Sequence, residues 1–335
     1  MTKYGEMLII DAKLVETFLK GRESFLIDLV ERVYRAHHAG NTVCPDSYFL
    51  RFPDTPRDRI IALPSYINDQ TCVSGIKWIS SFPENVDHGL QRASAVIVLN
   101  NTDNGYAYAF IEASRISAAR TAASAALAVR VLHGAPTSIG AVGSGPIAQT
   151  TLHFIKSLYT TAVPVKIHDL NSELVARIVT RHGPECSVVS LEEALGCDLV
   201  LLATSAGTPY VPMSVRFQPN QLVLNISLRD LHPETIRTAN NVFDDVEHCL
   251  KANTTPHLLE QLNGNRNFIT GTLAEFICSE KQLDPDHPTV FSPFGLGILD
   301  LAVAQSLYEH VQISGDGLRV PDFHGDMKRL SLIHI

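Results

Sequence analysis

A glycine-rich turn between a predicted strand and a predicted helix is the part of the sequence with the clearest chemical meaning. An apolar run, Ser138 to Val142, leads into Gly143-Ser144-Gly145-Pro146-Ile147-Ala148, and a helical pattern follows. In this G-x-G-x-x-A arrangement the first glycine permits a tight turn, and the second lets the backbone approach a pyrophosphate. The N–H groups that begin the helix face the anion, and a proline at the first helical position needs no N–H partner. The turn therefore predicts a dinucleotide-binding site.

A carboxylate follows the next predicted strand along the chain. Asp169 comes 26 positions after Gly143 (169 − 143), about where an acid binds the ribose hydroxyls of the adenosine half of a dinucleotide. Lys166, on the same strand, favours a phosphate only weakly. We therefore expect the cofactor to be NAD rather than NADP. The alternative is that Asp169 only caps a strand end or a helix.

Two later strands also end in polar side chains. Thr204 and Ser205 follow the apolar run 199–203, and Asp230 follows the run 222–226. Ligands of open parallel sheets bind at the carboxyl ends of the strands. Thr204 and Ser205 either line the cofactor or begin a turn, and the sequence supports both interpretations equally. Asp230 is expected near the position of a nicotinamide.

Four basic residues in the first part of the chain could bind carboxylates. Lys77 stands in Gly75-Ile76-Lys77-Trp78, and Arg51, Arg59 and Arg120 accompany it. Arginine presents a planar fork that matches a carboxylate. A lone lysine more often reaches the surface, and a single arginine more often forms a surface salt bridge.

These side chains need a framework, and the residue patterns predict one with two parts. Residues 12–20 and 23–39 show helical spacing, and short β-branched or aromatic runs follow at 47–51, 59–63, 72–78, 93–100 and 106–111. From residue 138 strands and helices alternate, with strands at 138–142, 165–167, 199–203 and 222–226 and one helix beginning near Ser172. A last helix is expected at 296–311. The alternation predicts an α/β protein with a parallel sheet that is covered on both faces.

Length, charge and cysteine content argue against several classes of protein. At 335 residues the chain has room for two domains. A formal charge of −8 without a run of Lys and Arg argues against nucleic acid or a membrane surface as partner. Six scattered cysteines lack metal-type spacing, so we predict reduced thiols and no metal site. Residues 1–6 do not resemble a targeting segment and no apolar run reaches membrane-spanning length, so we expect a cytoplasmic protein.

Five segments together resemble the family of ornithine cyclodeaminase and mu-crystallin: Gly75–Trp78, Ala119–Ala123, the glycine turn, Asn225–Asp230 and Phe294–Asp300. The resemblance covers nearly the whole chain and is specific to the family rather than to one substrate. It implies a homodimer in which a Rossmann-type doubly wound parallel sheet is inserted into an α+β domain for substrate binding and dimerisation. The implied boundaries are 1–118 for the first part of that domain, 119–299 for the NAD-binding domain, and 300–335 for a helix and tail that return to the first.

The resemblance also implies roles for residues at matching positions. Lys77 and Arg120 match basic residues that contact the substrate amino acid, and Asp230 matches an aspartate that serves the chemistry beside the nicotinamide. The catalytic candidates are therefore Lys77 and Asp230. The substrate-binding candidates are Arg51, Arg59, Lys77 and Arg120. The cofactor-binding candidates are Arg120, Thr121, Gly143, Ser144, Gly145, Pro146, Ile147, Asp169, Thr204, Ser205, Ser227 and Gly295.

One departure from the family pattern bears on the reaction. Cyclodeaminases of the family place a catalytic glutamate three residues before the proline that matches Pro64, and this chain has Ile61 there. The stretches 58–65, 74–79, 112–114 and 225–227 instead resemble family members that oxidise N-(2-amino-2-carboxyethyl)-L-glutamate with NAD. Those enzymes release 2-oxoglutarate and L-2,3-diaminopropionate, a building block of siderophores and peptide antibiotics. The alternatives are a cyclodeaminase, ketimine reductase or amino-acid dehydrogenase, and a non-catalytic, crystallin-like protein that binds the cofactor.

Overall fold

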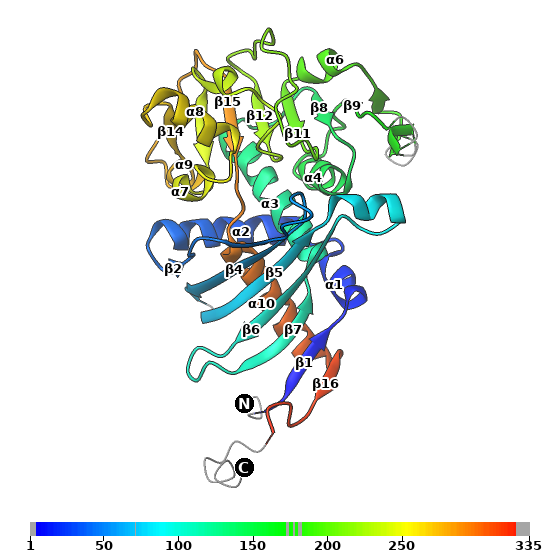
Figure 1. The fold of residues 1–335 in the computed structure, drawn as a ribbon. Helices are drawn as coiled ribbons and strands as arrows, with labels where there is room; N and C mark the ends of the chain where they lie inside the picture. The colour runs from blue at the N-terminus through cyan, green and yellow to red at the C-terminus, as the bar shows by residue number, and fades with distance from the viewer. Residues whose placement is uncertain (1–4, 71, 172–173, 177, 180–182, 326–335) are drawn as a thin grey trace. The chain divides into compact units, whose positions relative to one another are not determined.

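The computed structural model describes residues 5–70, 72–171, 174–176, 178–179 and 183–325. The chain divides into two compact units, which are described separately (Figure 1). The first unit comprises Met1–Arg22, Ala39–Ser117 and Gly297–Ile335, and the second comprises Glu23–His38 and Ala118–Leu296. The predicted start of a helix near Ser172 lies outside the described residues.

The second unit is built on an eight-stranded sheet whose neighbouring strands all run parallel, in the order β10-β9-β8-β11-β12-β15-β13-β14. Five of its strands, each four residues long, are buried along their whole length, which explains why apolar residues dominate β8, β11 and β12. The predicted doubly wound parallel sheet is therefore confirmed. The strands are β8 (Ile139–Val142), β9 (Val165–His168), β10 (Cys186–Val188), β11 (Leu199–Leu202), β12 (Leu222–Asn225), β13 (Asn240–Phe243), β14 (Ile269–Thr272) and β15 (Thr289–Ser292).

Helices connect these strands and pack closely on them. A Cβ atom on Gly140 of β8 would lie 1.8 Å from the carbonyl oxygen of Ala194, so only glycine allows α6 to pack this close to the strand. The helical elements of this unit include α2 (Glu23–His38), most of α3 (Ser114–Leu132), α4 (Pro146–Ser157), α6 (Leu191–Leu195), η2 (Pro233–Ile236), α7 (Val246–Cys249), α8 (Thr255–Asn263) and α9 (Leu273–Ile277).

The helix α2 belongs to the second unit, whereas the boundaries expected from the sequence place it in the first domain. Its buried face packs against α9, and the hydroxyl of Tyr34 forms a 2.8 Å hydrogen bond with that of Ser124 on α3. The partners of an amphipathic helix are distant in sequence, so helical spacing alone could not assign α2 to either unit.

The first unit holds a second eight-stranded sheet, in the order β16-β1-β7-β6-β5-β4-β2 with β3 paired to β4. The pair β1 and β7 is parallel and the others are antiparallel. The strands are β1 (Met7–Ile10), β2 (Thr42–Val43), β3 (Tyr48–Arg51), β4 (Arg59–Asn68), β5 (Cys72–Ser81), β6 (Ala93–Asn100), β7 (Ala107–Glu112) and β16 (Leu318–Val320). The helices of this unit are α1 (Ala12–Leu19), η1 (Pro83–His88) and α10 (Gly297–Ser314).

The helix α10 covers one face of this sheet, against β4, β5 and β6. Two glycines make the contact close. A Cβ on Gly297 would lie 2.4 Å from the Ser65 hydroxyl, and one on Gly75 would lie 3.2 Å from the Leu301 side chain. The other face carries exposed apolar side chains. Among the described residues, no helix has the length and hydrophobicity that crossing a membrane requires.

Candidate functional site

The glycine turn adopts the geometry that its sequence predicts. Gly143 has φ +93°, and a Cβ there would lie 2.4 Å from the carbonyl oxygen of Ala203. Both the backbone conformation and the lack of space therefore require glycine at this position. Gly145 is the N-cap residue of α4, no side chain caps the helix there, and a Cβ on it would meet no atom within 4 Å. Open space therefore lies beside Gly145 at the N-terminus of α4, where Pro146 is exposed and Ile147 half-buried.

Asp169 lies at this turn, at the end of β9. Its Oδ2 accepts hydrogen bonds from the backbone N–H of Ser144 at 2.7 Å and from the Ser144 hydroxyl at 2.6 Å. Its Oδ1 accepts one from the N–H of Asn171 at 2.8 Å. Ser144 therefore fixes the carboxylate beside the turn, a contact that the sequence analysis did not predict.

Asp230 follows β12 and is fully buried. Its carboxylate accepts hydrogen bonds from the hydroxyl of Thr204 at 2.7 Å and from that of Ser227, and the phenol of Tyr210 also interacts with it. Burial raises the pKa of Asp230, while these hydrogen bonds favour the ionised form. The structure thus brings together the ends of β11 and β12, as expected for neighbouring parallel strands.

Thr204 makes the contact expected of a residue that begins a turn, and it also contacts Asp230. Its hydroxyl oxygen accepts a 3.1 Å hydrogen bond from the N–H of Ala206, as a turn-forming threonine does, and it also donates to Asp230. Ser205 is exposed.

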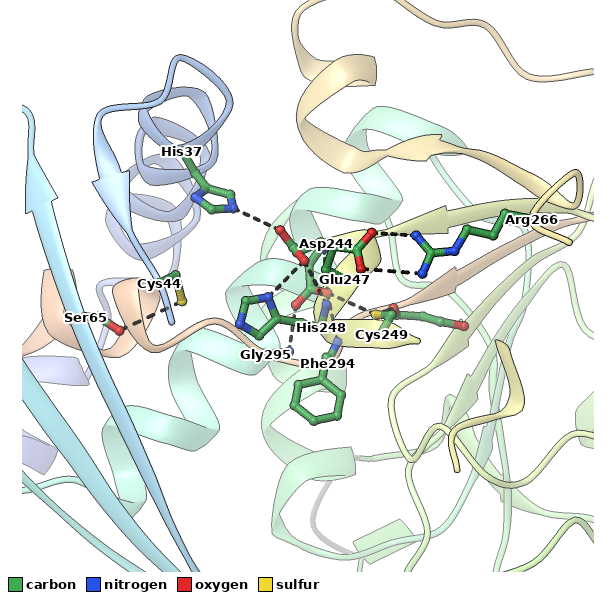
Figure 2. Close-up of polar contacts among 12 residues, drawn as sticks. His37, Cys44, Ser65, Asp244, Glu247, His248, Cys249, Arg266, Phe294 and Gly295 are labelled. Atoms are coloured by element: carbon green, nitrogen blue, oxygen red, sulfur yellow. Dashed lines mark hydrogen bonds and ion pairs between the residues drawn. The ribbon is translucent and has the colours of Figure 1, made fainter. Parts of the chain in front are cut away.

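Arg120 and Gly295 form another contact within the second unit. Arg120 is 9% exposed, and a Cβ on Gly295, whose φ is +97°, would lie 2.5 Å from its guanidinium. Figure 2 shows the residue that fixes the Gly295 backbone: Asp244 accepts N–H groups from Phe294 at 2.9 Å and from Gly295 at 2.6 Å. Burial raises the pKa of Asp244, although the hydrogen bonds from Phe294 and Gly295 act to lower it. Asp244 was not among the predicted site residues, and Thr121, which was, lies half-buried one position after Arg120.

In the first unit, Lys77 forms a buried ion pair. Its Nζ lies 2.6 Å from Oδ2 of Asp300, with 2% of the lysine side chain and none of the aspartate exposed. The Ser117 hydroxyl accepts a longer contact from the same Nζ at 3.4 Å. Lys77 therefore does not extend to the surface as a lone lysine usually does. Breaking such a pair leaves an uncompensated charge in the interior, so each partner depends on the other.

The strand register places the other basic candidates of this unit. Arg51 of β3 is paired with Arg59 of β4, and Leu63 of β4 is paired with Lys77 of β5. Because paired residues of antiparallel strands point to the same face, all three basic side chains start from the face that α10 covers. Arg59 is four residues from Leu63 along β4, about 13 Å at the usual strand rise. The two arginines are thus neighbours of each other, while Lys77 lies farther along the same face.

Ile61 lies on the same face of β4, between Arg59 and Leu63, and it is paired with Phe49 of β3 and Ile79 of β5. The position where cyclodeaminases carry a glutamate is therefore occupied by an apolar side chain with apolar partners in both adjacent strands.

One group of potential metal ligands forms through folding. Within the described residues, ligand atoms of His38, Cys278 and Glu280 lie within 4.8 Å of one another. His38 and Glu280 are exposed and share a 3.0 Å hydrogen bond, and Cys278 accepts a 3.8 Å contact from Arg35. The spacing of cysteines in the sequence could not reveal this group, and we assign no metal ion to it.

Comparison with known proteins identifies the relatives of this chain. The sequence model of the ornithine cyclodeaminase/mu-crystallin family matches residues 12–315. The chain belongs to this family. The resemblance inferred from the five motifs is thereby confirmed, and the likeness extends over most of the chain.

Several members of the family are similar over nearly their full length. The N-((2S)-2-amino-2-carboxyethyl)-L-glutamate dehydrogenase of Staphylococcus aureus is 29% identical over 92% of this chain and 96% of its own. The alanine dehydrogenase of Archaeoglobus fulgidus is 24% identical over 95% and 99%. The structure of Thermococcus litoralis Δ1-pyrroline-2-carboxylate reductase in complex with NADH and L-proline superposes with a TM-score of 0.84 at 25% identity, covering 94% of this chain and 100% of that one.

Proposed function

We propose that this protein is an NAD-dependent oxidoreductase that acts on N-(2-amino-2-carboxyethyl)-L-glutamate and yields 2-oxoglutarate and L-2,3-diaminopropionate. The observation that carries the proposal of a nucleotide-dependent enzyme is the open space at Gly145, in front of the N-terminus of α4, with the Asp169 carboxylate fixed beside it. The substrate is proposed from the similarity to the Staphylococcus aureus enzyme and from Ile61.

The residues at the turn fit a dinucleotide. A pyrophosphate needs close approach to backbone N–H groups, and the free space at Gly145 offers it. Ribose hydroxyls need an acceptor, which Asp169 supplies, and a carboxylate there disfavours the extra phosphate of NADP. NAD supplies a hydride acceptor when it is bound.

The chain's own residues then have distinct tasks. Asp230 accepts the proton of the substrate amine or of the water that attacks the imine, for which it must be ionised. Lys77, whose Nζ pairs with Asp300, orients a substrate carboxylate and stabilises negative charge during the attack. Loss of hydride and a proton converts the amine to an imine, and addition of one water cleaves its carbon–nitrogen bond into the two products.

The arginines suit the charge of this substrate. The substrate carries three carboxylates, and Arg51, Arg59 and Arg120 offer guanidinium groups in a protein of net charge −8. Ile61 distinguishes oxidation from cyclisation, because an isoleucine cannot perform the proton transfers of a catalytic glutamate.

A substrate comparison tests this proposal. Purified protein is incubated with NAD and, in parallel, with the carboxyethyl glutamate amine, ornithine, lysine, alanine or proline, and NADH formation is followed. We expect the first amine to give the highest kcat/KM. Faster turnover of another amino acid would overturn the substrate, and absence of turnover with all of them would favour the non-catalytic alternative.

A pair of lysine variants serves as the control. Lys77→Ala should abolish turnover while NAD binding persists, and Lys13→Ala, at an exposed position of α1, should behave as wild type. Normal turnover by Lys77→Ala would remove this residue from the catalytic set.

We also propose that the protein is a homodimer in which a second copy covers the open face of the first unit's sheet. By register, Val43, Tyr48, Leu50, Trp78 and Phe110 all lie on the face opposite α10, and all are exposed. Trp78→Glu should yield a monomer in light scattering, whereas Val188→Glu, at an exposed position of β10, should not. A wild-type monomer would contradict this part of the proposal.

A further inference from the structure

Tyr210 connects the buried Asp230 to the outside. Its backbone N–H donates a 3.1 Å hydrogen bond to the Asp230 carbonyl oxygen, and its phenol lies next to the Thr204 hydroxyl and the Asp230 carboxylate and interacts with both. Tyr210 is 38% exposed, whereas Asp230 has no exposed surface. One side chain therefore spans from the carboxylate to the solvent.

The burial of Asp230 limits what it can contact directly. A carboxylate without accessible surface cannot touch a substrate unless its neighbours move, and hydroxyls of Thr204 and Ser227 occupy its two oxygens. A proton must therefore reach Asp230 through one of the hydroxyls next to it, which belong to Thr204, Ser227 and Tyr210. Among the three, Tyr210 has a phenol, which is far more acidic than the alcohols of serine and threonine.

We propose that Tyr210 relays protons between the reacting substrate and Asp230. The inference rests on the proposed function. In the relay, the substrate amine or the attacking water gives a proton to the phenol oxygen while the phenol proton passes to the Asp230 carboxylate. Tyr210 begins and ends neutral, Asp230 gains one proton, and the reverse transfers restore both groups.

The electrostatics of the cluster suit this role. Burial raises the pKa of Tyr210, and the negative charges of Asp230 and Asp169 raise it further, so the phenol keeps its proton at neutral pH. Burial also raises the pKa of Asp230, which makes it the better proton acceptor, while Arg229 and the three hydroxyls act in the opposite direction. A protonated donor thus faces a basic acceptor.

The test is the variant Tyr210→Phe, which keeps the ring and removes the hydroxyl. We expect kcat for the amine that wild type oxidises to fall at least tenfold while the Kd for NAD is unchanged. Tyr106→Phe is the matched control, because Tyr106 is exposed to a similar extent and its ring contact with His324 survives the change. Wild-type kcat in Tyr210→Phe would overturn the relay.

A pH profile separates a relay from a structural role. Without the relay, the remaining rate should rise with pH, since hydroxide replaces the missing base; a rate reduced by the same factor at every pH would show that Tyr210 only supports the fold, and would overturn the relay. Wild-type turnover is measured first. Its absence for every amine refutes the proposed function, whereas an active wild type with an unaffected variant refutes the relay alone.

Discussion

The glycine turn of the second unit and the Lys77–Asp300 pair of the first unit depend on sequence in opposite ways. The turn is contained in six consecutive residues, and the roles of its two glycines follow from their residue type. The ion pair joins residues 223 positions apart, and neither residue alone indicates the other. Binding elements built from backbone geometry can therefore be read locally, whereas a buried charge acquires its partner only when distant elements pack.

The largest effect is expected from breaking the ion pair. Lys77→Met leaves the Asp300 carboxylate buried and uncompensated, so the free energy of unfolding should fall by about 3–5 kcal/mol in denaturant titrations. The double variant Lys77→Met with Asp300→Leu should recover much of this stability without activity. If the single variant is as stable as wild type, the two charges do not depend on each other.

The turn offers a contrast between two glycines of one motif. Gly143→Ala forces a side chain into a left-handed position and against the Ala203 carbonyl, which should cost about 3 kcal/mol of stability and abolish NAD binding. Gly145→Ala meets no protein atom, so its melting temperature should stay unchanged while its affinity for NAD falls by tenfold or more. Thermal denaturation and fluorescence titration measure both. Unchanged NAD affinity in Gly145→Ala would show that the open space holds no phosphate.

Asp230 is intermediate between the local glycine turn and the distant ion pair, because the hydroxyls beside it follow two adjacent strands. Burial raises its pKa above the ordinary value, and a base works only when ionised, so kcat/KM should fall as the pH drops through this raised pKa. Asp230→Asn should lower kcat by about 100-fold or more and remove that limb of the profile. The exposed Asp316→Asn is the control. An acid limb that persists in Asp230→Asn would assign it to another group.

The smallest effect, on the affinity for NAD, is expected at Ser144, whose contact with Asp169 the sequence did not predict. Ser144→Ala removes one hydrogen bond to the carboxylate, so the Kd for NAD should rise by about fivefold, or about 1 kcal/mol. Ser157→Ala, at the end of α4, should leave it unchanged. Tighter NAD binding in Ser144→Ala would mean that the serine hydroxyl competes with the ribose.

The same distinction explains how much the sequence could predict. The strands β8, β9, β11 and β12 were predicted because buried parallel strands are apolar runs between helices, and the strands around Lys77 were predicted from their β-branched residues. The strands β1, β10, β13, β14, β15 and β16 were not predicted, because all but β1 contain polar residues and no neighbouring motif such as the glycine turn marked them.

The site shows the same limit. Lys77, Asp169 and Asp230 could be named from motifs, but the side chains that hold them could not. Asp300 is a single carboxylate in an otherwise apolar helical pattern, and this was the only sign in the sequence that it has a buried partner. Tyr210 lies in a segment without a periodic pattern, so nothing in the sequence marked it. Their importance comes from burial and hydrogen bonding, which depend on the tertiary fold.

The central claim is that this chain couples NAD reduction to cleavage of a glutamate-derived amine. Its most direct test is a product balance, in which NADH, 2-oxoglutarate and L-2,3-diaminopropionate are quantified after incubation of the full chain with NAD and N-(2-amino-2-carboxyethyl)-L-glutamate. We predict that the three appear in equal amounts. Absence of all three, together with release of ammonia from ornithine by the same preparation, would contradict the account.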